Sequence, residues 1–150
     1  MAKPRHNILI LNGPNLNMLG VREPGIYGLQ TLTDIANDCS EYADELGFDI
    51  DFRQTNAEGE MVTIIQQARG NHAALIINAG AYTHTSIAIH DALKVLEVPV
   101  IEVHLSNPMA REAFRHTSYI SPVAKGTICG FGGHGYILAL NALRSLLDEG

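Results

Sequence analysis

The sequence predicts an α/β protein in which a mostly parallel five-stranded sheet carries helices on both faces. Three short apolar runs without polar alternation, at residues 8–11, 73–77 and 98–103, are typical of strands that are buried on both sides. Between such runs, apolar residues recur at intervals of three and four, which is the spacing of a helix face. Because strands and helices alternate along the chain, crossover connections and parallel strands are expected.

The first half of the chain supplies two strands and two helices. The first strand, at residues 8–11, is followed by Thr31 and Asp34, a capping-box pattern that begins a helix ending at Gly47. Apolar and charged side chains then alternate over residues 48–53, as in a half-exposed strand at a sheet edge. Residues 58–69 return to helical spacing.

The second half continues the alternation. It is expected to contain a strand at 73–77, a helix whose inner side carries Ile89, Ala92, Leu93 and Leu96, a strand at 98–103, a basic helical turn at 110–116, a strand at 127–130 and a helix at 135–147. Five strands with an amphipathic second strand at the edge fit the order 2-1-3-4-5 of a flavodoxin-like three-layer sandwich. We expect residues 1–150 to form a single domain.

This strand order predicts where a ligand binds. In an open α/β sheet the site lies beyond the carboxyl ends of the strands at the switch point, here between the first and third strands. The loops after the first, third and fourth strands must therefore meet. Their polar residues are Asn15, Arg22 and Tyr27, then Asn78, Tyr82 and His84, then His104, Ser106, Asn107, Arg111 and Arg115.

The composition excludes several classes of protein. An apolar fraction of 46% and a charged fraction of 17% are those of a folded globular chain. The net charge of -6, without any basic cluster, argues against a nucleic-acid partner. The apolar runs are far shorter than the ~20 residues of a membrane-spanning helix, and no signal-peptide core precedes the first strand. We therefore expect a cytoplasmic protein in which Cys39 and Cys129 are buried and unpaired.

No cofactor motif stands in a convincing context. Residues 130–135 match GxGxxG, but they follow the last strand, so no later strand carries the acid that binds a ribose. Tight helix entry with close backbone packing is favoured over a dinucleotide site. The His and Cys spacings match no metal motif. We expect neither a cofactor nor a metal.

The first loop, from about residue 12 to residue 28, has the composition of a lid over a polar site. It is long for a compact domain and carries amides, Arg22 and Tyr27 with glycines around them. Tyr27 becomes a base near neutrality after a pKa shift of about two units, or roughly 2.7 kcal/mol. A guanidinium about 4 Å away supplies ~1 kcal/mol in water but ~4 kcal/mol at an effective dielectric near 20. Arg22 can therefore activate Tyr27 only under a closed lid. The alternatives are a plain surface loop and a tyrosine that packs on it.

His104 is the strongest candidate for proton transfer among the histidines. It follows a buried strand, and Glu102, two residues earlier, points to the same side and can fix its tautomer. The alternative is that Glu102 is a buried acid paired with some other cation. His84 is equally suited to proton transfer and to substrate binding. Arg111 and Arg115 lie one turn apart in the predicted basic turn, where they form either a solvated face or a carboxylate-binding fork.

Five blocks of sequence resemble the signatures of the type II 3-dehydroquinate dehydratase family. They are Leu11-Asn-Gly-Pro-Asn-Leu-Asn17, Arg22-Glu-Pro…Tyr27-Gly28, Asn78-Ala-Gly-Ala-Tyr-Thr-His-Thr-Ser86, Glu102-Val-His-Leu-Ser-Asn107 and Arg111-Glu-Ala-Phe-Arg-His-Thr-Ser-Tyr119. The resemblance runs in order over essentially the whole chain. It implies a single catalytic domain that dehydrates 3-dehydroquinate to 3-dehydroshikimate without a cofactor or metal, and a homododecamer built as a tetramer of trimers.

The resemblance also implies roles for individual residues. Tyr27 takes the proton alpha to the ketone, Arg22 lowers the pKa of Tyr27, and Asn15 positions a water that holds the enolate. His104 protonates the departing hydroxyl. Substrate binding falls to Asn78, His84, Leu105, Ser106 and Arg115, with Asp91 reaching a neighbouring subunit's site.

Two other classes of function stay open at this stage. One is a non-enzymatic flavodoxin-like module that binds a small ligand, and the other is a metal-dependent lyase. The sequence leaves both aromatic biosynthesis, through the shikimate pathway, and quinate breakdown as physiological roles.

Overall fold

The computed structural model describes residues 4–21 and 23–148, with the backbone alone at Tyr27. Its centre is a five-stranded parallel sheet in the order β2-β1-β3-β4-β5. The strands are β1 (His6–Asn12), β2 (Phe48–Gln54), β3 (Ala74–Asn78), β4 (Val100–His104) and β5 (Gly126–Cys129). The predicted flavodoxin-like fold and its strand order are confirmed.

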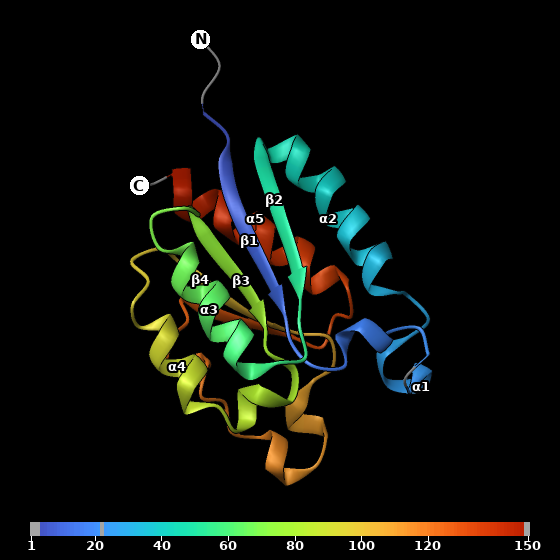
Figure 1. Ribbon diagram of the computed structural model, residues 1–150. Coiled ribbons are helices and arrows are strands. Elements are labelled where there is room, and N and C mark those ends of the chain that lie inside the picture. Colours follow the sequence, from blue (N-terminus) through green and yellow to red (C-terminus); the bar gives the residue numbers. More distant parts are fainter. Residues whose placement is uncertain (1–3, 22, 149–150) are drawn as a thin grey trace.

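Helices cover both faces of the sheet (Figure 1). One layer contains α2 (Leu32–Leu46) and α5 (His134–Asp148), and the other contains α3 (Glu58–Ala68) and α4 (Ile87–Leu93). Successive side chains of β1 alternate between the layers: Ile8 and Ile10 pack toward α2 and α5, whereas Leu9 and Leu11 pack toward α3 and α4. All four are fully buried, which explains why this strand shows no polar alternation.

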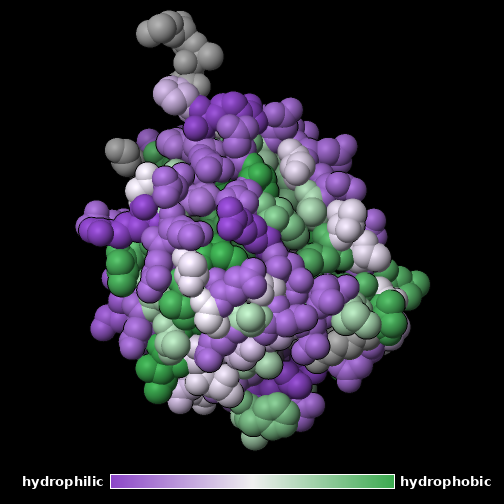
Figure 2. Space-filling view, in the orientation of Figure 1, coloured by the Kyte–Doolittle hydropathy of each residue, from purple (hydrophilic) through white to green (hydrophobic). Residues whose placement is uncertain are grey.

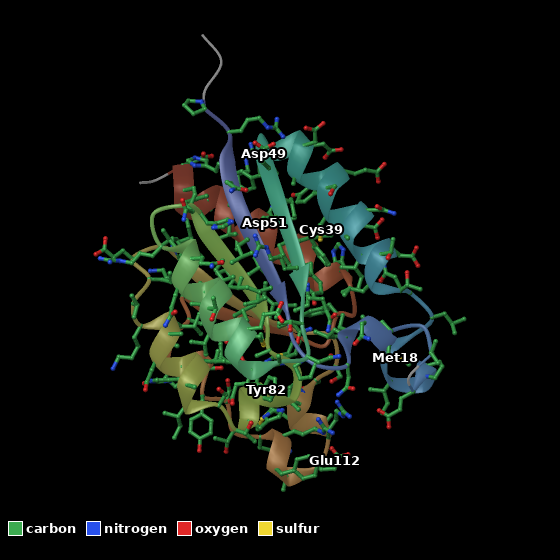
Figure 3. All side chains as sticks on the ribbon, viewed as in Figure 1. Met18, Cys39, Asp49, Asp51, Tyr82 and Glu112 are labelled. Atoms are coloured by element: carbon green, nitrogen blue, oxygen red, sulfur yellow. The ribbon has the colours of Figure 1, made fainter. Side chains whose placement is uncertain are left out.

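Several local signals act as the sequence predicted. The Thr31 side chain accepts the Asp34 backbone N–H, and the Asp34 carboxylate accepts the Thr31 N–H, so the capping box is complete. Gly47 adopts the left-handed conformation that ends α2. At the sheet edge, β2 is half-exposed as predicted: Phe48 is buried, Asp49 is exposed and Asp51 is partly buried (Figure 3).

Other predictions about the elements were wrong. The predicted basic turn is two 3-10 turns, η3 (Pro108–Ala110) and η4 (Ala113–Arg115), separated by Arg111 in an extended conformation. The Asn107 side chain caps the first turn, and the extended residue breaks the helical path, so the two arginines do not share one helix face. The helix containing Ile89 ends at Leu93, because Val95 and Leu96 form tighter i→i−3 bonds. Cys39 is buried and free as expected, but the free thiol of Cys129 is only partly buried.

The carboxyl ends of β1, β3 and β4 meet at one edge of the molecule (Figure 1). The segments that follow them gather there: η1 (Leu16–Met18), α1 (Pro24–Tyr27), η2 (Gly80–His84) and the two turns after β4. Two more pieces complete the chain, the 3-10 turn η5 (Ser121–Val123) before β5 and the helix α5 after it. Within the described residues, no helix has the length and hydrophobicity needed to cross a membrane.

The chain leaves β1 through a very close approach to the segment after β3. The Gly13 N–H donates to the Asn78 carbonyl at 2.8 Å, and a Cβ at position 13 would lie 2.5 Å from the Ala79 carbonyl oxygen. A side chain here would push apart the two loops that flank the switch point. Glycine is therefore required by space.

We predict that Gly13→Ala lowers the free energy of unfolding by about 1–3 kcal/mol, because backbone must move to accept the methyl group. Gly59→Ala is the matched control. It lies in α3, and a Cβ there would meet no described atom within 4 Å, so a gain of about 0.5 kcal/mol is expected. Urea unfolding of both variants provides the comparison. Equal free energies of unfolding for Gly13→Ala and Gly59→Ala would contradict the close approach of Gly13 to Ala79.

Candidate active site

A cavity lies at the switch point and is lined from the loops that the strand order predicted. The segment after β1 contributes Pro14, Asn15 and Leu16; β3 and η2 contribute Asn78, Gly80, Ala81 and His84; β4 and the turns after it contribute His104, Leu105, Ser106, Pro108, Arg111 and Arg115. Figure 3 shows Tyr82 and Glu112 at this same end of the sheet. Amide, imidazole, hydroxyl and guanidinium groups therefore share one space.

Most of the residues predicted for the site line this cavity. They are Asn15, Asn78, His84, His104, Leu105, Ser106 and Arg115. Asp91 is exposed on α4 and is not among the lining residues of this chain. Arg22 and the side chain of Tyr27 lie outside the described residues, so the predicted pair between them stays a prediction.

Asn78 is held by a buried polar network. Its side-chain NH2 donates to the Tyr136 hydroxyl at 3.0 Å, and that hydroxyl donates to the Asn12 side-chain oxygen at 2.5 Å. The Asn78 side-chain oxygen accepts the Gly80 N–H at 3.2 Å. Burial raises the pKa of Tyr136 well above its ordinary value, so the phenol stays protonated and keeps donating. The network links β1, β3 and α5 and sets the Asn78 amide at the cavity.

His104 is paired with Glu102 at the end of β4. Its Nε2 lies 2.6 Å from Glu102 Oε2, and the two side chains are 10% and 1% exposed. A carboxylate can only accept, so Nε2 carries a proton. The second ring nitrogen, Nδ1, is then the atom left for chemistry in the cavity. The predicted juxtaposition of Glu102 and His104 is confirmed.

Glu102 has three further donors, the hydroxyls of Ser118, Ser121 and Thr127. Burial alone would raise the pKa of Glu102. The bonds from His104 and Ser121 and the charge of His104 outweigh that effect, so the pKa lies below its ordinary value and the group is ionised near neutrality.

The tautomer of neutral His84 follows from its hydrogen bond. Its Nδ1 lies 2.8 Å from the Thr117 carbonyl oxygen, which can only accept. Nδ1 is therefore protonated, and Nε2 of the neutral ring is an acceptor. The side chain lines the cavity, so it can bind a hydroxyl group or take up a proton there.

The two arginines of the cavity have different partners. Arg115 donates to Glu112 at 2.5 Å and lies over the Phe114 ring, and this bond lowers the pKa of the Glu112 carboxyl. Arg111 donates to Ser106 Oγ at 3.3 Å and lies 4.0 Å from Glu23 of the first loop. These contacts place two guanidinium groups on the cavity wall, where a carboxylate can bind.

The first loop lies beside the cavity. Asn15 adopts a left-handed conformation, and its backbone N–H donates to the Asn56 side chain at 3.0 Å. Leu16 and Leu19 are buried and anchor the start of the loop, whereas Met18, Val21, Ile26 and Leu29 are exposed. Figure 2 shows hydrophobic residues gathered on that side of the molecule. The loop is therefore anchored at its base, and its exposed residues include polar ones, such as Asn17 and Glu23, as well as these apolar ones.

The glycine-rich stretch after β5 has a packing role, as the sequence favoured. Gly130 and Gly132 donate backbone N–H groups to the His104 and Leu105 carbonyls. A Cβ on Gly133 would overlap the Gln30 side chain. The motif therefore hydrogen-bonds the residues at the end of β4 and packs closely against Gln30, which follows the first loop. In the described part of the chain, no group of three or more His, Cys, Asp or Glu side chains is arranged to hold a metal ion.

Sequence reasoning missed the supports of the site. Tyr136 falls inside the helix predicted at 135–147 and was not singled out, and Ser118, Ser121 and Thr127 follow no spacing that signals function. Only Thr127 had a positional signal, because it lies opposite Glu102 in the β4–β5 register.

Comparison with known proteins is consistent along the chain. Residues 6–144 match the family model described as Dehydroquinase class II. A protein of Rhizobium etli named 3-dehydroquinate dehydratase is 59% identical over 139 residues, which are 93% of this chain and 96% of that protein. A Pseudomonas aeruginosa protein named 3-dehydroquinate dehydratase 2 is 60% identical over 133 residues, 89% and 90% of the two chains. The crystal structure of type II dehydroquinase from Propionibacterium acnes has a TM-score of 0.92 at 49% identity, with 96% and 99% covered.

We predict that Tyr136→Phe lowers the free energy of unfolding by about 1–3 kcal/mol, because it leaves buried amide groups of Asn12 and Asn78 without their partner. Tyr42→Phe is the matched control. Its hydroxyl accepts from Asn141 in an exposed bond, so a change below about 0.5 kcal/mol is expected. Urea unfolding measures both. Similar losses of unfolding free energy in the two variants would show that the buried network contributes no more to stability than an exposed hydrogen bond does.

Proposed function

Because the chain belongs to the class II dehydroquinase family, we propose that it is a hydro-lyase that dehydrates 3-dehydroquinate to 3-dehydroshikimate. The observation that carries the proposal is the cavity at the switch point, where Asn78, His104 and Arg115 meet in a chain that matches the family over residues 6–144. Its groups suit a small polyhydroxylated acid: guanidinium for a carboxylate, amides and imidazoles for hydroxyls.

The proposed reaction begins with loss of the proton alpha to the ketone. Tyr27, as phenolate, takes this proton, and Arg22 of the same loop lowers the pKa of the phenol when the lid excludes water. The electron pair moves onto the ketone oxygen. Asn15 positions a water that donates to the resulting enolate, which is an oxyanion-hole device.

The second step expels water. The enolate electrons return to form the conjugated double bond, the carbon–oxygen bond to the departing hydroxyl breaks, and His104 supplies the proton that makes the leaving group water. The Glu102 pair supports this role, because Nε2 is occupied and Nδ1 is left to donate. For this transfer His104 has to hold a proton on each ring nitrogen, and the Glu102 carboxylate lies 2.6 Å from Nε2 of that form.

The remaining predicted residues are proposed to bind the substrate. The Arg115 guanidinium is proposed to hold the substrate carboxylate, while Asn78, His84 and the backbone amides of Leu105 and Ser106 bind oxygens of the substrate. Each of these residues lines the cavity. Asp91 lies on the exposed side of α4, which is consistent with a contribution to a neighbouring subunit's site.

The wider setting is also a proposal. We propose that residues 1–150 are one catalytic domain that assembles as a homododecamer, a tetramer of trimers, and acts in the cytoplasm without a cofactor or metal. Its place is the shikimate pathway, toward chorismate and the aromatic amino acids. Quinate breakdown is the alternative physiological role.

One assay tests the proposed activity. 3-Dehydroquinate is added to the protein in the presence of a chelator, and the ultraviolet absorbance of the conjugated enone product is followed. Steady appearance of the product is expected. Binding without product would indicate a small-ligand-binding module instead, and activity that the chelator abolishes would indicate a metal-dependent lyase.

We predict that Tyr27→Phe lowers kcat by at least about 10²-fold, the usual contribution of a positioned base, with little change in substrate affinity. The phenyl ring keeps the shape of the side chain and removes only the group that takes the proton. Product absorbance gives kcat, and calorimetry gives affinity. Tyr82→Phe is the control. The Tyr82 hydroxyl donates to the Asn56 backbone carbonyl and Tyr82 does not line the cavity, so a kcat close to that of the wild-type protein is expected. Near-normal turnover in Tyr27→Phe would remove Tyr27 as the base.

We predict that His104→Ala loses product formation by about 10²–10⁴-fold but still exchanges the alpha proton of the substrate with solvent. Proton abstraction precedes the step that needs the imidazole, so the enolate forms and is reprotonated. Proton NMR of the substrate in deuterated water measures the exchange. If exchange and elimination fall together, His104 is not confined to the second step.

A further inference from the structure

Three hydroxyl groups surround the buried carboxylate behind His104, and the reaction proposed above assigns them no role. Ser118 donates to Glu102 Oε2 at 2.8 Å, and Thr127 donates to Oε1 at 3.0 Å. Ser121 also donates to Oε1. We refer to Ser118, Ser121 and Thr127 as the hydroxyl ring.

We propose that the hydroxyl ring is a positioning device: it keeps Glu102 as a carboxylate, and that carboxylate holds the His104 ring for its proton transfer. This inference rests on the proposed function of the site. The residues of the ring act through Glu102 and do not touch the substrate.

The direction of the Ser118 hydrogen bond is fixed by its other partners. Ser118 Oγ accepts the backbone N–H groups of Ile120 and Ser121, each at 3.0 Å. With both lone pairs occupied, its single proton has to point at Glu102. Ser118 therefore cannot accept a hydrogen bond from the O–H of a neutral Glu102 carboxyl, and it favours the ionised form.

The other side of the carboxylate is built by the sheet. Glu102 and Thr127 are partners in the β4–β5 register, so their side chains lie on the same face. Ser121 lies at the start of η5 and reaches the same oxygen. With His104 on Oε2, both oxygens have two donors, and a carboxylate that accepts several such bonds titrates below its ordinary range.

The other titratable groups around the pair do not replace the ring. His84, Arg115, His116 and Cys129 line the same small cavity beside Glu102. The hydrogen bonds of Arg115 and His116 run to Glu112 and to the Arg111 carbonyl, and that of His84 to the Thr117 carbonyl. Burial and the Glu102 charge raise the pKa of the Cys129 thiol, which therefore stays neutral. Within the described residues, His104 is the one ionisable side chain hydrogen-bonded to Glu102.

The segment that carries two of the hydroxyls also orients the second histidine. The Thr117 carbonyl accepts from His84 Nδ1, and the Tyr119 N–H donates to the Thr83 carbonyl at 2.8 Å. One short stretch after the site arginines thus holds η2 and the Glu102–His104 pair together. The ring is part of the same framework that sets the histidines of the cavity.

The test compares two double variants. Ser121→Ala/Thr127→Val removes both donors to Oε1, whereas Ser121→Thr/Thr127→Ser exchanges the residues and keeps both hydroxyls. Glu102 has to be ionised for the reaction, so activity falls as the pH drops through its pKa, and losing donors raises that pKa. We expect the acid limb of kcat to move up by about one pH unit in the first variant, with KM little changed.

A second readout separates positioning from general damage. In the variant without the hydroxyls, alpha-proton exchange with solvent should exceed product formation several-fold more than in the wild-type protein, because only the second step uses His104. The variant that keeps the hydroxyls should match the wild-type protein in both readouts. Superimposable pH profiles and exchange ratios for all three proteins would overturn the proposal.

Two further measurements cover a double variant that fails to fold and a wild-type protein that is inactive. If the double variant fails to fold, Thr127→Val against Thr127→Ser is measured in the same way; a smaller shift in the same direction supports the ring, and identical profiles overturn it. If the wild-type protein does not dehydrate 3-dehydroquinate, the proposed function fails. Carbon-13 NMR titration of the Glu102 carboxyl then tests the ring alone: a higher pKa without the hydroxyls supports it, and an unchanged pKa overturns it.

Discussion

A buried negative charge at the end of β4 is the constraint on which the site depends. The Glu102 side chain is 1% exposed, and a carboxylate removed from water is stable only when charge and hydrogen bonds replace its hydration. His104 supplies one of these bonds from the cavity side, and three hydroxyls supply the others from the segment leading to β5. The geometry of the imidazole is therefore a consequence of how the fold accommodates an acid.

The strand order explains why the cavity forms next to the Glu102–His104 pair. The order 2-1-3-4-5 reverses direction between β1 and β3, so the chains leaving these two strands diverge and leave a space at their ends. Gly13 approaches Ala79 closely where the two chains leave the sheet, and Tyr136 bridges the amides of Asn12 and Asn78, which fixes the Asn78 side chain at the cavity. Backbone packing and a buried polar network thus place side chains from segments far apart in the sequence around one cavity.

Much of this arrangement was accessible from the sequence. Apolar runs and helical spacing predicted the fold, and the strand order alone predicted that the segments around Asn15, Asn78 and His104 would meet. Position and charge singled out His104 with Glu102, and Tyr27 with Arg22, as candidates for proton transfer, whereas the specific step assigned to each residue came from the resemblance to a family. The arginines were misplaced on one helical turn, since nothing in the local pattern shows that Arg111 is extended between two short turns. The hydroxyls around Glu102 were also missed, because partly exposed Ser and Thr residues follow no periodicity, and their meaning depends on which strand lies opposite.

The central claim is that Glu102 is ionised and holds a protonated Nε2 of His104. Nitrogen-15 NMR of the ligand-free protein, labelled at histidine and recorded near neutral pH, tests it most directly. We expect His104 Nε2 to bear a proton that its bond to the carboxylate protects from exchange with water. An Nε2 resonance without an attached proton would show that Glu102 does not hold His104 in this way.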